Sequence, residues 1–266
     1  MSEIDWQFWF LFPVAMAIAI LAMAIGVSGA NFWAPLYLLW LRLDTSLGFW
    51  LSLVSMLFGF SSGVVRNLRQ GTVNLFLLRP YLTVALPATV LGAVAAPFVS
   101  ARWLFLAFAV FLFLYTTHLV LTLRGAGGGG SPPRQDRIAW RVAVLGGVLT
   151  GLITVGLGEL LVPHCLRHPR CQTPAEAVGT TVTIVFVVSL CAALVRLTPE
   201  LVAVLHVRSR QLWSMLVFVI PGVLIGGQLG PRIAVCISPP MLQRLRIGVL
   251  YLISGLMLWR FCFTPQ

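Results

Sequence analysis

The sequence predicts an all-α polytopic membrane protein made of two homologous repeats, with eight to ten transmembrane segments. Hydrophobic residues make up 59% of the chain and charged residues only 9%, and the mean hydropathy is +0.97, a composition that soluble domains do not have. Its uncharged runs repeatedly exceed the roughly 18 residues that mark a spanning helix. Glycine and proline also recur at corresponding places in the two halves, which indicates an internal duplication.

The first apolar segment is too long to be a single spanning helix. Residues 6–41 are 36 positions without a charge, and a helix of that length would extend roughly 54 Å, whereas the hydrocarbon core is about 30 Å thick. Its middle contains Gly26, Gly29 and Pro35, which are residue types that interrupt helices. Because backbone freed at membrane depth must be satisfied by protein or by a water-filled cavity, we expect a broken or re-entrant first segment.

Seven further apolar runs follow, and each is long enough to span the bilayer as a helix. In chain order they cover residues 45–65, 80–101, 103–123, 142–166, 177–195, 211–231 and 241–262. The run 142–166 opens the second half and contains a second interruption, Gly156-Leu157-Gly158-Glu159, followed by Pro163. We therefore expect a broken first segment in each half.

A segment rich in glycine and proline separates the two halves, as a flexible linker would. The predicted domains are a first transmembrane repeat at 1–124, a cytoplasmic linker at 125–140 and a second transmembrane repeat at 141–266. An ungapped comparison of the halves supports the duplication. At a constant offset of 134, matching residues are Pro87, Gly92 and Pro97 in the first half and Pro221, Gly226 and Pro231 in the second.

Arginine placement predicts the orientation. In the first half, seven arginines lie between residues 66 and 141 on the side of the linker and only two on the opposite side, so we expect the linker to be cytoplasmic. The second half divides its arginines five to four and decides nothing. One crossing per broken segment would give eight helices and parallel repeats, and two crossings would give ten and inverted repeats. We favour inverted repeats, because they set the two breaks antiparallel at the midplane.

The two breaks are the predicted substrate site. A helix that begins at membrane depth presents free N–H groups and about half a positive charge, which suits an anion, and small residues let an oxyanion approach the backbone. Hydroxyls on the helices that follow could line the same cavity. Alternatively, the glycines only permit close helix packing and the hydroxyls only bond their own helix. The predicted substrate-binding residues are Ser28, Gly29, Ala30, Asn31, Ser52, Ser55, Gly156, Gly158, Thr180 and Thr181.

Glu159 is the acidic residue that lies well inside an apolar run. A carboxylate there is costly and marks a proton or ion pathway by default, so we predict that Glu159 couples transport to a proton or another ion. Two alternatives stay open, namely that it neutralises an arginine such as Arg196 or that it lies at a solvent-exposed rim. Asn31 holds the equivalent place in the first half, and its amide could donate to an anion.

A run of soft ligands, His164, Cys165, His168 and Cys171, follows the second break. Its spacing fits no standard zinc pattern, and the neighbouring arginines would repel a cation. We therefore predict no metal and no cofactor. The alternative function is a membrane-embedded thiol- or metal-handling protein that uses this cluster, since flanking arginine charge favours a reactive thiol at Cys171.

The chain resembles the sulfite exporter TauE/SafE family. Gly26–Pro35 and Gly156–Pro163, each followed by a spanning helix, are similar to that family's paired glycine-rich motifs, and Ala177–Thr181 is similar to the motif after the second break. The resemblance extends from about residue 8 to residue 261. It implies a membrane permease for sulfite, sulfonates and related small sulfur anions. The family's Gly-Gly-Gly core is Ser28-Gly29-Ala30 in the first copy and Gly156-Leu157-Gly158 in the second.

The sequence thus predicts a secondary transporter, and not an enzyme, in the bacterial cytoplasmic membrane. Its expected cargo is a small sulfur-containing anion such as sulfite, thiosulfate or an organosulfonate, and its expected partners are this anion, the lipid bilayer and a coupling proton or ion. The chain has no Walker A motif for ATP. Its scattered arginines do not form the basic face of a nucleic-acid binder. Two alternatives stay open, namely that the protein forms a homodimer and that it is a channel instead of a transporter.

Overall fold

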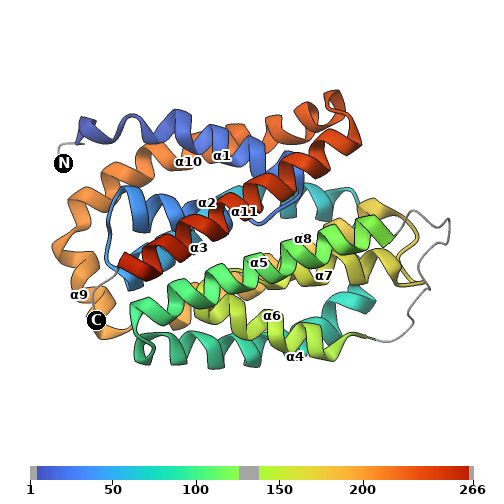
Figure 1. The fold of residues 1–266 in the computed structure, drawn as a ribbon, viewed down its shortest axis with the longest axis horizontal. Coiled ribbons are helices and arrows are strands. Elements are labelled where there is room, and N and C mark those ends of the chain that lie inside the picture. The colour runs from blue at the N-terminus through green and yellow to red at the C-terminus, as the bar shows by residue number, and fades with distance from the viewer. Residues whose placement is uncertain (1–4, 126–137, 264–266) are drawn as a thin grey trace.

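The computed structural model describes residues 5–125 and 138–263, and these form helices joined by short connections, without strands (Figure 1). The elements are η1 (Trp6–Phe8), α1 (Leu11–Ile25), α2 (Ala30–Pro35), η2 (Leu36–Trp40), α3 (Thr45–Arg69), α4 (Leu75–Ala95), η3 (Ala96–Phe98), α5 (Ala101–Gly125), α6 (Trp140–Ile153), α7 (Leu157–Arg167), α8 (Pro174–Val195), α9 (Pro199–Val207), α10 (Ser209–Cys236) and α11 (Pro239–Phe263).

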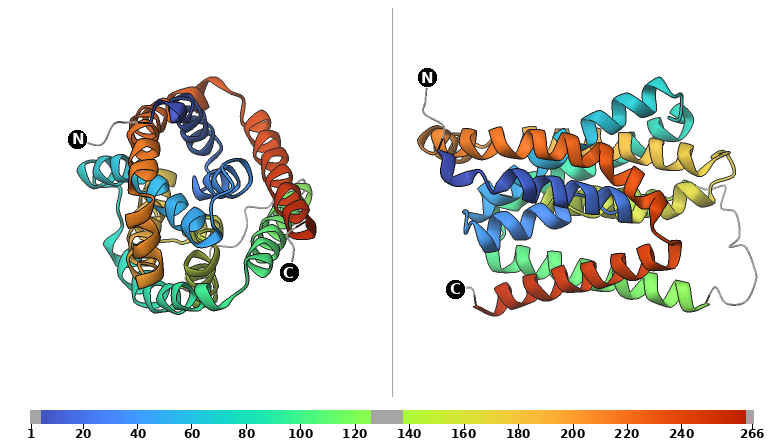
Figure 2. Two further views of the ribbon diagram at one scale, coloured as in Figure 1. Left: turned by 90° about the vertical axis from the view of Figure 1, so that its left-hand side faces the viewer. Right: turned by 90° about the horizontal axis from the view of Figure 1, so that it is seen from above.

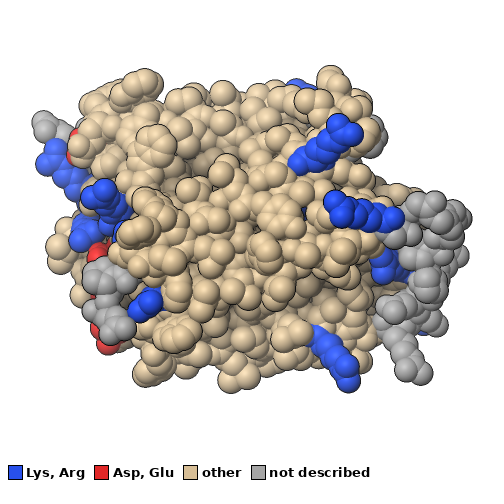
Figure 3. All heavy atoms as spheres, in the orientation of Figure 1, with Lys and Arg blue, Asp and Glu red and all other residues tan. Residues whose placement is uncertain are grey.

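Within the described ranges, seven helices are long and apolar enough to cross a membrane. They comprise α1 together with η1, α3, α4 with η3, α5, α8, α10 and α11. Figure 3 shows the charged side chains gathered at the two ends of the molecule, with a broad belt between them that is almost free of charge. Such a belt matches the hydrocarbon layer of a bilayer, and the protein is a multi-pass membrane protein.

Both halves begin with a broken helix, as predicted. The helix α1 ends at Gly26, which has a left-handed φ of +67° and whose N–H, like that of Val27, bonds the carbonyl of Ala22, a glycine-dependent helix stop. The chain turns at residues 26–29 before α2 starts. In the second half, α6 ends at Thr154, with φ of +67°, and α7 starts at Leu157. We call residues 26–29 break 1 and residues 154–156 break 2.

Helices of the two halves interleave. The helix α1 packs on α10 and α6 packs on α4, while α3 packs on α8 and α5 on α11. In the end-on view of Figure 2, α2 lies inside a ring of longer helices. Each of these eight helices thus has its main contact with a helix of the other half, in the reciprocal pattern that two related repeats would give. That the repeats are inverted stays a prediction.

Two glycines from the ungapped comparison occupy the corresponding helix crossings. A Cβ added to Gly92 of α4 would lie 2.2 Å from the carbonyl oxygen of Val148 on α6, and a Cβ added to Gly226 of α10 would lie 2.4 Å from that of Met16 on α1. Only glycine permits this approach, which small residues provide in membrane helix pairs. Gly92 and Gly226 therefore have the same structural role in the two halves, which is to permit a close helix crossing.

Several boundaries differ from the sequence-based ones. The helix α4 begins at Leu75 and not near residue 80, because the side chain of Asn74 accepts hydrogen bonds from the N–H groups of Phe76 and Leu77 and so caps the helix. The short helix α9 was not predicted, although Thr198 and Pro199 form a typical helix start. The predicted linker falls mostly on residues 126–137, outside the described residues.

Replacing Gly92 or Gly226 with alanine should lower stability by about 1–3 kcal/mol, since the new methyl group forces two helices apart. The matched control is Gly255→Ala on α11, where nothing lies within 4 Å of the added Cβ. Thermal unfolding of the purified protein in detergent measures the difference. A Gly226→Ala midpoint as high as that of Gly255→Ala would contradict the close crossing.

Candidate functional site

A single buried carboxylate, Glu159 of α7, joins the two breaks. Its Oε2 accepts a hydrogen bond from the N–H of Gly156 at 3.2 Å, within break 2. Its Oε1 accepts from the N–H of Ser28 at 3.1 Å and from the side-chain amide of Asn31 at 2.8 Å, both at break 1. Glu159 is 3% exposed, which excludes a position at a solvent-exposed rim. The two breaks therefore face each other in the protein interior.

The local sequence explains why Glu159 takes this place. It is the third residue of α7, and a glutamate there bonds back to the N–H before the helix in a capping-box arrangement. Gly156 supplies a φ of +134° that other residues rarely adopt. The N–H of Leu157 donates to the hydroxyl of Thr150 at 3.2 Å. Because the cap uses only Oε2 of Glu159, its Oε1 is available to the donors at break 1.

Asn31 and Glu159 hold equivalent positions, each four residues before the proline of its motif, Pro35 or Pro163. The Asn31–Glu159 hydrogen bond therefore joins corresponding positions of the two motifs. The Oδ1 atom of Asn31 is buried there without a hydrogen-bond partner among the described residues, so one acceptor at the centre is unused.

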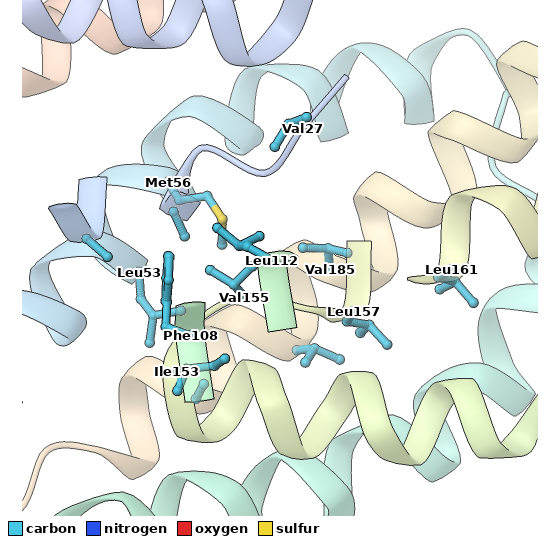
Figure 4. Close-up of a cluster of buried hydrophobic side chains, with 14 of the residues drawn as sticks. Val27, Leu53, Met56, Phe108, Leu112, Ile153, Val155, Leu157, Leu161 and Val185 are labelled. Carbon is cyan, nitrogen blue, oxygen red and sulfur yellow. The ribbon is translucent and has the colours of Figure 1, made fainter. Parts of the chain in front are cut away.

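The surroundings of the carboxylate are apolar. Figure 4 shows Val27 of break 1, Val155 of break 2, Met56 of α3 and Leu112 of α5 among the side chains of one buried hydrophobic cluster, which brings residues of both breaks together. Hydrogen bonds to a charge are stronger in such a low-dielectric setting. A neighbouring cavity lined by Gly29 has a volume of about 20 Å³, enough for about one water molecule. In this conformation that cavity is too small for a sulfur oxyanion.

A polar contact joins α5 to the last helix of the second half. Arg246 of α11 donates a hydrogen bond to the hydroxyl of Tyr115 on α5.

The structure brings together one part of the predicted site and not the other. The residues of the two breaks gather around Glu159. The hydroxyls are engaged elsewhere, however: Ser52 and Thr181 donate to carbonyls of their own helices, and Ser55 bonds the hydroxyl of Tyr37 at 2.7 Å. Thr180 accepts from the backbone N–H of Asn74 at 2.8 Å. A substrate role for these four residues stays a prediction.

The amides at the breaks differ from the expectation of unpaired N–H groups. Those of Ser28 and Gly156 donate to Glu159, and that of Leu157 donates to Thr150. The physical reason is burial, because each unsatisfied backbone group in an apolar interior costs several kcal/mol. The anion-binding donors exist, and a carboxylate of the protein itself occupies them.

Close helix packing does not explain two of the break glycines. A Cβ on Gly29 would meet its nearest atom at 3.7 Å, and one on Gly158 at 3.5 Å, which is ordinary van der Waals contact. This differs from Gly92 and Gly226, where a Cβ would collide with backbone. Close helix packing therefore does not require glycine at position 29, within break 1, or at position 158, two residues after break 2.

Arg196 does not pair with Glu159. The residue is 5% exposed, and its guanidinium donates from Nε and Nη2 to the carbonyl of Gly151 at 3.1 and 2.7 Å, and from Nη2 to that of Leu152 at 2.7 Å. Burial lowers the pKa of Arg196 to about 10. It thus caps the C-terminal end of α6, where a cation is favoured, just before break 2. The sequence shows only an arginine after an apolar run and does not reveal this contact.

The soft ligands after break 2 do not assemble. No three His, Cys, Asp or Glu side chains of the described residues lie close enough together to hold a metal ion, and the ring of His164 bonds the carbonyl of Leu160 at 2.9 Å. The guanidinium of Arg170 lies 3.7 Å from the ring centre of Phe76. Burial raises the pKa of the Cys171 thiol to about 11, which disfavours the thiolate form.

These features define a class of protein: a helical, multi-pass membrane protein whose two interleaved halves each contain a broken helix, with polar groups buried where the breaks meet, as in secondary transporters. The family model of the sulfite exporter TauE/SafE matches residues 11–258. The chain belongs to this family, whose members are membrane permeases and not enzymes. Searches among curated proteins and solved structures gave no match.

Gly156→Ala should destabilise the protein by about 1–3 kcal/mol, because alanine does not adopt a φ of +134° without strain. Gly158→Ala, two residues later, should leave stability unchanged or raise it, since alanine is the better helix former and its methyl group has room. Thermal unfolding in detergent compares the two. Equal losses of stability would contradict the assigned backbone geometry of break 2.

Proposed function

We propose that this protein is a secondary transporter that moves a small sulfur-containing anion, such as sulfite, thiosulfate or a short organosulfonate, across the bacterial cytoplasmic membrane. One observation carries the proposal: donors from both breaks converge on a single anionic group at the centre of the molecule, the carboxylate of Glu159. Membership of a permease family supports it.

The donor set suits an oxyanion. A carboxylate and a sulfite or sulfonate group each present oxygen acceptors that share a negative charge, and neither can donate when ionised. The N–H groups of Ser28 and Gly156 and the amide of Asn31 therefore form a site that the cargo can use in place of Glu159. No cationic side chain contacts the carboxylate among the described residues, so binding rests on backbone and amide dipoles.

The same donors supply a coupling mechanism. They cannot serve Glu159 and a substrate anion at once, and two negative charges side by side in an apolar interior repel strongly. A proton on Glu159 removes its charge and weakens its hold on Ser28 and Asn31. Proton uptake by Glu159 would therefore accompany anion binding.

The position of the site suits alternating access. Break 1 belongs to the first half and break 2 to the second, so a shift of one half against the other changes the site itself. Because Glu159 of α7 is the link between the breaks, its release frees α2 from α7. The conformation in which Glu159 holds both breaks would then be one with a closed centre.

Proteoliposomes that contain the protein should take up radiolabelled sulfite, thiosulfate or a short sulfonate faster than empty liposomes. The variant Asn31→Leu should abolish this flux, because it removes the shortest hydrogen bond to the central anion. Absence of flux for every anion in the wild-type protein would overturn the proposed function. Unchanged flux in Asn31→Leu would overturn the assigned site.

Glu159→Gln should make anion flux independent of the pH gradient, since glutamine mimics the protonated acid and cannot titrate. Anion affinity should rise about tenfold or more, because the competing charge is gone. Glu200→Gln is the matched control: Glu200 is an exposed acidic residue in the first turn of α9, and its loss should leave both properties intact. Gradient-dependent flux that persists in Glu159→Gln would refute this coupling.

A further inference from the structure

A second polar cavity lies away from the central site. It has a volume of about 190 Å³ and lies among the starts of α3 and α5 and the ends of η3 and α8. Since α5 begins beside it, the cavity lies at the opposite end of that helix from Gly125. Its polar lining consists of Thr45, Ser46 and Arg196, and Phe49 is the aromatic residue of its wall.

Arg196 brings a buried positive charge to this cavity. Its Nε and Nη2 atoms are held by the carbonyls of α6, while its Nη1 has no hydrogen-bond partner within the described part of the chain. The neighbouring carboxylate of Asp44 pairs with Arg208 at 3.3 Å instead. A buried charge without a counter-ion is costly, and an anion in the cavity would remove that cost.

The start of α3 adds donors of the right kind. This helix is 25 residues long and begins at Thr45, and the side chain of Asp44 makes no capping hydrogen bond to it. The first N–H groups of a helix lack partners inside the helix and carry partial positive charge. The hydroxyls of Thr45 and Ser46 can donate beside them. The guanidinium and the helix start thus face the same space from two sides.

The size of the cavity suits a small oxyanion. A water molecule takes up about 30 Å³ in the liquid, so a cavity of about 190 Å³ accommodates a four-heavy-atom anion such as sulfite together with a few waters. The aromatic ring of Phe49, 5.8 Å from the guanidinium carbon of Arg196, limits further hydration of the charge.

We propose that this cavity is a second anion-binding site, in which Arg196, Thr45 and Ser46 bind a small oxyanion such as sulfite or sulfate. The site lies where α3 and α5 begin. Through Arg196, the site contacts α6 immediately before break 2, because Gly151 and Leu152 precede the break by a few residues. That its natural occupant is the transported anion rests on the proposed function. The proposal that the cavity binds a small oxyanion does not depend on the proposed function.

Equilibrium dialysis of radiolabelled sulfite with the purified protein in detergent tests the site. The measurement is made in the Asn31→Ala background, which weakens the central site. Sulfite should still bind there, and adding Arg196→Gln should weaken this binding about tenfold or more, because the buried cation is lost. Arg42→Gln removes an exposed arginine near the start of α3 and should not change the affinity.

A second variant keeps the test decisive if Arg196→Gln does not fold, since Arg196 also caps α6. Thr45→Val combined with Ser46→Ala leaves the arginine in place and should weaken sulfite binding several-fold. Wild-type affinity in that variant, or in a folded Arg196→Gln, would overturn the second site. Failure of the transport proposal gives a different result, because sulfite would then bind in dialysis while proteoliposomes show no flux.

Discussion

The structure depends on one constraint: a helix broken inside an apolar interior leaves backbone N–H groups that must find acceptors. This protein breaks a helix twice and satisfies the key amides of both breaks with the same carboxylate. Glu159 caps its own helix through Gly156 and reaches across to Ser28 and Asn31. The position of α2 relative to α7, and with it the fit between the halves, follows from this shared acceptor.

That arrangement also explains why the breaks suit transport. Each hydrogen bond to the charged carboxylate is worth about 1.5–3 kcal/mol, and under the proposed coupling a proton on Glu159 would weaken these bonds. Elsewhere the helices are fastened by glycine crossings such as Gly92 and Gly226, where backbone meets backbone. The molecule thus combines tightly packed helix pairs with one hydrogen-bonded link between its two breaks.

Much of this could be predicted from the sequence. The excess length of residues 6–41 and the glycines at both motifs required two breaks, and the matched prolines and glycines indicated the duplication. Glu159 stood out as an acidic residue in an apolar run. Its partners could not be predicted, because a contact across 131 residues, as between Ser28 and Glu159, leaves no periodic signal. The bonding of Arg196 to α6 depends on helix packing in the same way.

The central claim is tested most directly by a double-mutant cycle on Asn31 and Glu159. The free energy of unfolding in detergent would be measured for the wild type, Asn31→Ala, Glu159→Ala and the double variant. If the carboxylate joins the two breaks, the single losses should not add, and the coupling energy should be about 1.5–3 kcal/mol. Losses that add to within about 0.5 kcal/mol would show that the two residues do not interact, and the account of a shared central carboxylate would be wrong.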